Sequence, residues 1–173
     1  MERVLHPLPR DLDAAVLILL HLTPRHKSLL PRILARSTRL DVREAVDGDV
    51  LVPGLVYVAP PDAHLLVTAD GEIRLDRSEL VHHVRPSADV LLLSLAREYN
   101  GRCLAVVLSG TGIDGAAGTA AVKRAGGVVV AQDEATAEHF GMPGAAILAG
   151  GVDEVLPLED IGRAVVAFVK SSA

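Results

Sequence analysis

Short, uninterrupted runs of aliphatic residues alternate with longer stretches of helical spacing along most of this chain. The clearest runs cover residues 15–20, 104–108 and 128–131. Strands that helices bury on both faces show this continuous apolar pattern, whereas strands with one wet face alternate apolar and polar residues. We therefore expect an α/β protein with a mostly parallel sheet.

The composition agrees with an aliphatic core. Half of the 173 residues are hydrophobic, but only 2 % are aromatic and none is Trp. A chain of this size suits one domain, since about 150 residues bury roughly 68–70 % of their unfolded surface. The scarcity of aromatic residues disfavours a β-sandwich anchored by Trp or Tyr.

Charge and cysteine usage exclude several classes of partner. The formal net charge of −5 disfavours a broad nucleic-acid or anionic-membrane surface, because both need a basic face. Cys103 is the single cysteine, so an intrachain disulfide is excluded and a reducing compartment is expected. The longest apolar stretch, residues 14–20, is shorter than the roughly 18 residues of a membrane span, and residues 1–8 lack a signal-peptide pattern. We expect a cytoplasmic protein that neither binds nucleic acid nor inserts into a membrane.

The middle of the chain predicts a different kind of sheet. Strand-like runs are short here, and Asp70-Gly71 is a hairpin turn signal. We expect an antiparallel section formed by residues 42–45, 55–59, 64–68 and 72–75. Helices are predicted over residues 88–99, 116–125, 143–148 and 158–170, with a strand near Val155. Together these elements predict a doubly wound α/β fold whose mostly parallel sheet is flanked by helices and carries an antiparallel hairpin section.

The glycine loop at residues 110–115 has two interpretations. Its G-x-G-x-x-G pattern follows a strand, opens a helix and precedes Asp133, which is the arrangement of a dinucleotide-binding fingerprint. Alternatively, Asp114 accepts a hydrogen bond from Nδ1–H of His21, which leaves Nε2 of that histidine as a base. His21 follows a buried strand, so both residues belong to strand ends where α/β sheets place their sites. Asp114 could also merely cap the following helix, and His21 could be structural.

Several separate motifs, in order along nearly the whole chain, resemble one family. VVLSGTGIDGAAG (106–118), QDEA (132–135) and FGMP (140–143) are similar to the catalytic domain of the chemotaxis protein-glutamate methylesterases of the CheB type. DG (47–48), PG (53–54), VYVAP (56–60) and RPSADVL (85–91) resemble the middle section of the same family. The match of so many motifs is far more specific than the glycine loop alone.

The resemblance implies a serine hydrolase that removes methyl groups from glutamate methyl esters on chemoreceptors, and in some members deamidates glutamines. His21 and Asp114 match the histidine and aspartate of the family's catalytic triad. Thr111 and Gly112 then belong to a loop that helps line the substrate site, and no cofactor or metal is needed. The implied partner is a methyl-accepting chemoreceptor or a similar methylated protein. Residues 1–173 are expected to form a single catalytic domain without a receiver domain.

The third member of the implied triad has no counterpart. The family's serine lies in a glycine-rich turn after a first strand, yet Ser28 is the first serine of this sequence. A chain without the nucleophile should be nearly inactive. A late gene start or a trimmed chain, a pseudoenzyme that binds receptors without hydrolysing them, and a replacement nucleophile such as Ser109 are the alternatives.

Two further features depart from the family or suggest other chemistry. Thr111 stands where the family typically has Met, and Thr136 stands where it often has Ser. The adjacent His82 and His83 invite a metal interpretation, but no Cys or His cluster accompanies them, so we expect no zinc site.

Overall fold

The structure, a computed structural model, describes residues 1–21 and 28–172. Its helices and strands follow one another along the chain as α1 (Glu2–Leu5), β1 (Val16–Ile18), α2 (Leu30–Leu34), β2 (Asp41–Glu44), β3 (Leu55–Val58), β4 (His64–Val67), β5 (Ile73–Asp76), α3 (Ala88–Tyr99), β6 (Leu104–Val107), α4 (Ala116–Arg124), β7 (Val128–Gln132), α5 (Gly141–Leu148), β8 (Glu154–Leu156) and α6 (Leu158–Ser172). The α/β class is confirmed, and so are the four helices predicted after residue 87.

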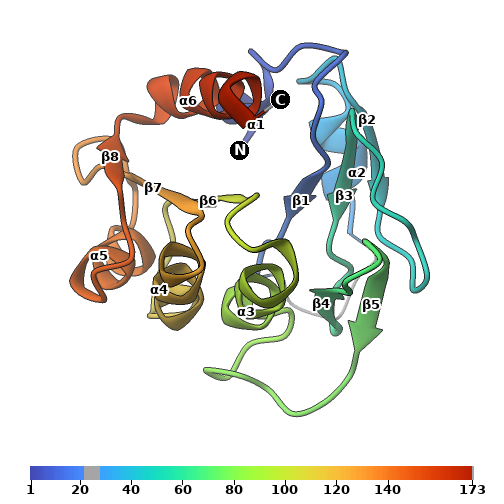
Figure 1. The fold of residues 1–173 in the computed structure, drawn as a ribbon. Coiled ribbons are helices and arrows are strands. Elements are labelled where there is room, and N and C mark those ends of the chain that lie inside the picture. The colour runs from blue at the N-terminus through green and yellow to red at the C-terminus, as the bar shows by residue number, and fades with distance from the viewer. Residues whose placement is uncertain (22–27, 173) are drawn as a thin grey trace.

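Two parallel three-stranded sheets form the centre of the molecule. Their strand orders are β1-β3-β2 and β6-β7-β8, and a separate antiparallel hairpin joins β4 to β5. Helices cover both faces of the second sheet, with α1 and α6 on one side and α4 and α5 on the other (Figure 1). Successive residues of β7 reach opposite cores, since Val129 packs with Val122 of α4 and Val130 packs with Ile161 of α6. Both faces are buried, which explains the continuous apolar runs.

The antiparallel section is smaller than the sequence predicted. Residues 64–68 and 72–75 do form the β4-β5 hairpin, whose turn includes a positive φ at Gly71. The runs at 42–45 and 55–59, however, belong to β2 and β3, which pair in parallel. The prediction was wrong there because β3 lies between β1 and β2 and is buried on both faces, with Val56, Tyr57 and Val58 at 0–1 % exposure.

Each parallel sheet has one end strand that faces the other sheet in Figure 1. Among the described residues, β1 pairs only with β3 and β6 pairs only with β7. Leu17 of β1 and Val106 of β6 are correspondingly only half-buried. Helix α3 contacts both α4 and β4, and so joins the two halves of the molecule. The loops that follow β1 and β6 carry the residues considered next.

Candidate active site

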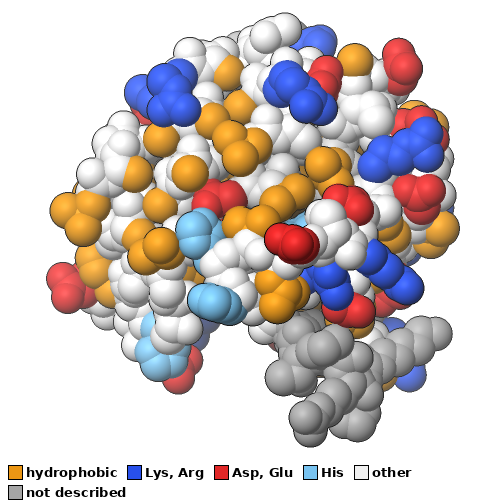
Figure 2. Space-filling view, turned by 90° about the horizontal axis from the view of Figure 1, so that it is seen from below, with side chains coloured by type: hydrophobic (Ala, Val, Ile, Leu, Met, Phe, Trp, Pro, Cys, Tyr) orange, Lys and Arg blue, Asp and Glu red, His pale blue; other side chains and the backbone are white. Residues whose placement is uncertain are grey.

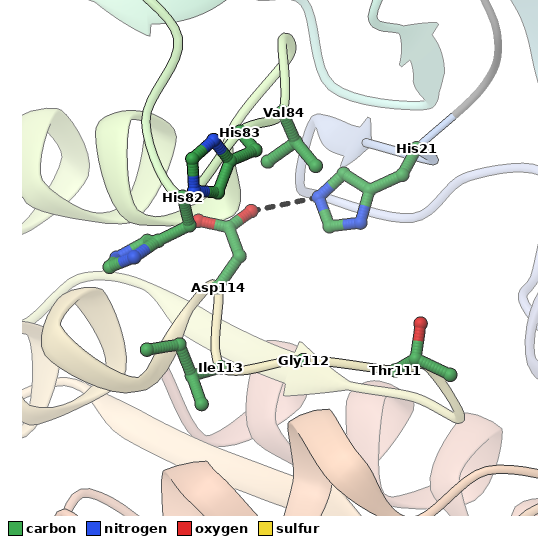
Figure 3. A pocket seen from close by; sticks show the side chains of 8 residues that line it. All are labelled: His21, His82, His83, Val84, Thr111, Gly112, Ile113 and Asp114. Carbon is green, nitrogen blue, oxygen red and sulfur yellow. Dashed lines mark hydrogen bonds and ion pairs between the residues drawn. The ribbon is translucent and has the colours of Figure 1, made fainter.

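His21 and Asp114 meet although 93 positions separate them in the sequence. Nε2 of His21 lies 2.8 Å from Oδ2 of Asp114 (Figure 3). His21 follows β1 and Asp114 follows β6, so the contact forms where the two parallel sheets approach each other. The side chain of Asp114 is only 4 % exposed, whereas that of His21 is 24 % exposed. The pair therefore combines a buried carboxylate with an imidazole that solvent or a ligand can reach.

Asp114 is fixed by the beginning of α3. Its Oδ1 accepts hydrogen bonds from the Ser87 hydroxyl at 2.6 Å and the Asp89 backbone N–H at 3.1 Å, and its Oδ2 accepts the Ala88 N–H at 2.6 Å. The N–H groups of Ala88 and Asp89 are available to Asp114 because the first N–H groups of a helix have no partner within the helix. The alternative that Asp114 caps the helix after it is wrong, since Gly115, at φ +96°, is the N-cap of α4. Asp114 instead completes the start of a helix that precedes it by 25 residues.

These contacts keep Asp114 ionised. Burial by itself would raise the pKa of its carboxyl group, because it penalises the charged form. The hydrogen bonds from His21, Ser87 and the N–H groups of Ala88 and Asp89 outweigh burial and hold the pKa of Asp114 below its ordinary value. An ionised carboxylate in this position accepts a hydrogen bond from the imidazole and stabilises an imidazolium.

The histidine nitrogen used in this contact differs from the prediction. The sequence reasoning assigned Nδ1 to Asp114, but the structure turns the ring so that Nε2 faces the carboxylate. Nδ1 is therefore the nitrogen left for chemistry, and in Figure 3 it lies on the side of the ring that faces Thr111. The rotamer of His21 decides which nitrogen is used, and no sequence pattern specifies it.

A pocket of about 300 Å³ opens beside the pair. The predicted site residues His21, Thr111, Gly112 and Asp114 all line it, and His82, His83, Val84 and Ile113 complete the lining. All four predicted residues are thus brought together. Figure 2 looks from below Figure 1, onto the face where the loop of residues 77–87 lies, and shows histidine side chains among hydrophobic ones. Among the described residues that line the pocket, Asp114 is the only carboxylate.

The loop that carries Thr111 and Gly112 is supported from behind by the start of α5. The Gly110 N–H donates to the His139 carbonyl at 2.9 Å, and the Met142 N–H donates to the Gly110 carbonyl at 2.8 Å. A Cβ at Gly141 would lie 3.1 Å from the Gly110 oxygen and the Gly112 nitrogen, so only glycine lets the two backbones approach this closely. The FGMP motif thus holds the loop in place.

The sequence reasoning missed a second histidine–aspartate pair beside the first. His82 Nε2 lies 3.0 Å from Oδ2 of Asp89, whose Oδ1 accepts the Gly118 N–H at 2.7 Å. Both His82 and His83 have positive φ, at 50° and 64°, in a tight turn between Val81 and Val84. The adjacent histidines at 82 and 83 were the signal for this pair in the sequence. Asp89 belongs to the RPSADVL motif, and nothing in that motif indicates a contact with His82.

One cluster of side chains beside the pocket has the composition of a metal site. Within residues 1–21 and 28–172, ligand atoms of His82, Asp89 and Asp114 lie within 4.8 Å of one another. Each oxygen of Asp114 already accepts two hydrogen bonds, which uses the lone pairs that a metal would need. The Asp114 oxygens are therefore better suited to accepting hydrogen bonds than to binding a metal ion.

Two other residues of the sequence hypotheses serve local structure. Oγ of Ser109 accepts the His139 N–H at 2.9 Å, and Ser109 does not line the pocket. The Asp133 carboxylate, expected at a ribose in the dinucleotide interpretation, accepts from the hydroxyl and N–H of Thr136. No helix of the described residues has the length and hydrophobicity needed to cross a bilayer.

Comparisons with known proteins agree with this arrangement. Residues 1–165 match the family model described as CheB methylesterase. The chain is 42 % identical to "Protein-glutamate methylesterase/protein-glutamine glutaminase 2" of Caulobacter vibrioides, covering 100 % of this chain and 51 % of the relative. It is 39 % identical to "Protein-glutamate methylesterase FrzG" of Myxococcus xanthus, covering 98 % and 51 %. The chain thus spans about half the length of the curated relatives it matches.

A solved structure is similar over almost the whole chain. The catalytic domain of the Thermotoga maritima CheB methylesterase superposes with a TM-score of 0.92 at 36 % identity. The superposition covers 96 % of this chain and 89 % of that domain. The fold and the sequence therefore point to the same group of proteins.

Proposed function

This chain belongs to the CheB methylesterase family, and on that premise we propose that its His21–Asp114 pair is the acid–base part of a centre that hydrolyses glutamate methyl esters on proteins. The observation that carries the proposal is the 2.8 Å contact between His21 Nε2 and a carboxylate kept ionised by three further donors. The proposal takes residues 1–173 as one catalytic domain, supported by the family match over residues 1–165.

The substrate class follows from the relatives and from the pocket. The names of the Caulobacter and Myxococcus proteins specify protein glutamate methyl esters and, for the first, protein glutamine. Both groups are uncharged. One part of the pocket lining is uncharged as well, namely Val84, Thr111, Gly112 and Ile113. We infer a methylated chemoreceptor or a similar methylated protein as the partner.

His21 would transfer the proton in both halves of the reaction. Its Nδ1 takes a proton from the attacking hydroxyl and later gives it to the departing methoxide, which leaves as methanol. Asp114 holds Nε2–H throughout and stabilises the imidazolium that forms in between. Water then releases the acid from the acyl intermediate by the same route.

The proposal requires a nucleophilic hydroxyl next to Nδ1 of His21. Among the described residues no hydroxyl forms a hydrogen bond with that nitrogen, since Ser87 donates to Asp114 and Ser109 accepts from His139. The resemblance to the family implies a serine in a turn after a parallel strand. Among the described residues, β1 and β6 each pair with a strand on one side only, so each offers an edge on which such a strand can pair.

The test measures methanol release from a peptide that contains a glutamyl methyl ester. The 173-residue chain and the longest in-frame product of its gene are assayed together, each with His21→Asn and Asp114→Asn. We expect the longest product to hydrolyse the ester and both substitutions to lower this activity by about 10³-fold or more. His6→Asn, at an exposed histidine outside the pocket, is the matched control. Unchanged hydrolysis in His21→Asn would refute the proposal.

A binding protein without hydrolysis is the second candidate, favoured because no hydroxyl of the described residues forms a hydrogen bond with Nδ1 of His21. In this case the longest in-frame product binds the ester peptide but releases no methanol. Calorimetric titration with the same peptide separates the two candidates. A failure to bind any such peptide would count against both.

A further inference from the structure

The Thr111 side chain occupies the part of the pocket where a leaving group would depart. We propose that the Thr111 hydroxyl accepts a hydrogen bond from the leaving amide of a glutamine side chain, and that it thereby favours glutamine over the glutamate methyl ester as a ligand of this site. The inference rests on the proposed function and identifies which of two uncharged side chains the site prefers.

The position of the leaving group follows from His21. A departing group must lie next to the nitrogen that protonates it, and Nε2 of His21 is occupied by Asp114. The leaving group therefore belongs beside Nδ1. In Figure 3 the Thr111 hydroxyl points into the opening on this side of the His21 ring. Both residues line the same pocket of about 300 Å³.

The two candidate leaving groups make different demands on this position. An amide presents two N–H donors that need acceptors, whereas the methoxy group of an ester presents a methyl group and needs none. Hydrolysis of the amide releases ammonia, with water supplying the oxygen of the new acid and His21 passing the proton to nitrogen. A pocket that offers an acceptor at the leaving group discriminates in favour of the amide.

Thr111 is the suitable acceptor. Asp114 is saturated by its four donors, and Val84 and Ile113 are apolar. His82 and His83 lie on the opposite side of Asp114 from Thr111 in Figure 3, and His82 Nε2 already contacts Asp89. The Thr111 hydroxyl forms no hydrogen bond with the residues that the structure describes, so its lone pairs are free for a ligand.

The loop holds the backbone that carries Thr111 in place before a ligand arrives. Gly110 is bonded to His139 and Met142 through its N–H and its carbonyl group. Gly112, directly after Thr111, has φ +88°, a left-handed conformation that glycine adopts without strain. A pre-positioned acceptor loses little entropy on binding, which preserves the effect of a single hydrogen bond.

The experiment compares three peptides that differ only at one side chain. They carry glutamine, the glutamate methyl ester, or the methyl ketone in which CH₃ replaces the amide NH₂. Their dissociation constants are measured calorimetrically for the 173-residue chain, for Thr111→Val and for Thr111→Ser. Thr111→Val retains the shape of the side chain without its hydroxyl, and Thr111→Ser retains the hydroxyl.

We expect the unmodified chain to bind the glutamine peptide about fivefold more tightly than the ketone and ester peptides, since one neutral hydrogen bond contributes roughly this factor. Thr111→Val should remove the preference, and Thr111→Ser should keep it. An unchanged preference in Thr111→Val, or no preference in the unmodified chain, would overturn the inference but leave the proposed function standing. Absence of binding to all three peptides would overturn both.

Discussion

Two histidine–aspartate pairs of similar geometry lie beside the same pocket and differ in nearly everything else. The Nε2–Oδ2 distances are 2.8 Å in His21–Asp114 and 3.0 Å in His82–Asp89. In the first pair the free imidazole nitrogen faces the opening toward Thr111, whereas the ring of His82 points away from it in Figure 3. Under the proposed function, proximity of an imidazole and a carboxylate is not enough, because the second ring nitrogen must also face the opening that receives the substrate.

The surroundings of the two carboxylates differ as well. Asp114 accepts four hydrogen bonds and ties β1, the start of α3 and the glycine loop together. Asp89 accepts two, from His82 and from the Gly118 N–H of α4. Asp114 therefore holds the start of α3 and, under the proposed function, also orients His21, while Asp89 mainly connects α3 to α4. The following predictions test this difference.

The largest difference should appear in catalysis. Under the proposed function, Asp114→Asn should lower kcat for the ester peptide about 10³–10⁴-fold, because the amide no longer stabilises the imidazolium. Asp89→Asn should lower kcat less than about tenfold, since Asp89 contacts no atom of His21. Steady-state kinetics with the ester peptide measures both. Equal losses would mean that the second pair also takes part in the chemistry.

Replacing Asp114 and replacing Asp89 should differ less in their effect on protein stability than in their effect on catalysis. Asp114→Ala should lower the free energy of unfolding by about 3 kcal/mol, because it strands the Ser87 hydroxyl and two N–H groups in the interior. Asp89→Ala should lower it by about 2 kcal/mol, since it strands chiefly the Gly118 N–H. Urea unfolding followed by circular dichroism gives both values. A larger loss in Asp89→Ala would reverse our ranking of the two sites.

The contribution of Asp114 to the free energy of unfolding should decrease in acid. Its pKa is lower in the folded protein than in the unfolded chain, so the unfolded state binds more protons on acidification. The stabilisation is complete above the unfolded pKa of about 3.9 and is lost as the pH falls through the lower folded value. The stability difference between the unmodified chain and Asp114→Asn should therefore be constant at neutral pH and shrink below about pH 4. A difference that grew on acidification would contradict the assigned direction.

The smallest effect concerns the turn that carries His82 and His83. Both residues have positive φ, which disfavours side chains with a Cβ by roughly 1–2 kcal/mol. His83→Gly should therefore raise the free energy of unfolding by about 1 kcal/mol after the extra entropy of glycine in the unfolded chain is subtracted. His82→Gly should give no gain, because it also removes the contact with Asp89. Thermal unfolding of the two variants measures this difference. An equal gain in stability for His82→Gly and His83→Gly would mean that the His82–Asp89 contact does not stabilise the fold.

Much of the fold was predictable because its signals are local. Ser87 and Gly101 bracket the predicted helix at residues 88–99, and the structure places α3 at the same residues. The parallel pairing of β2 and β3 was not predictable, because a short strand shows the same residues whichever direction its neighbour runs. The burial of β3 on both faces decided that pairing.

In the candidate site, too, the sequence motifs predicted some features and left others unpredicted. The family motifs identified His21, Asp114, Thr111 and Gly112, and all four line one pocket. The motifs did not indicate that Ser87 and two N–H groups of α3 hold Asp114, since these donors lie 25 to 27 positions from it in the sequence. They also gave no information on the His82–Asp89 pair, whose members meet through an unusual turn.

By itself the sequence determined the α/β class, the positions of the later helices and the residue types available for acid–base chemistry, because periodicity and turn residues act within a few positions. Only the tertiary structure decided that Asp114 binds the start of α3 rather than its own helix, and that Nδ1 of His21 is the nitrogen left free. Both outcomes depend on side-chain directions set by the packing of elements far apart in the chain, and these directions leave no periodic trace in the order of the residues.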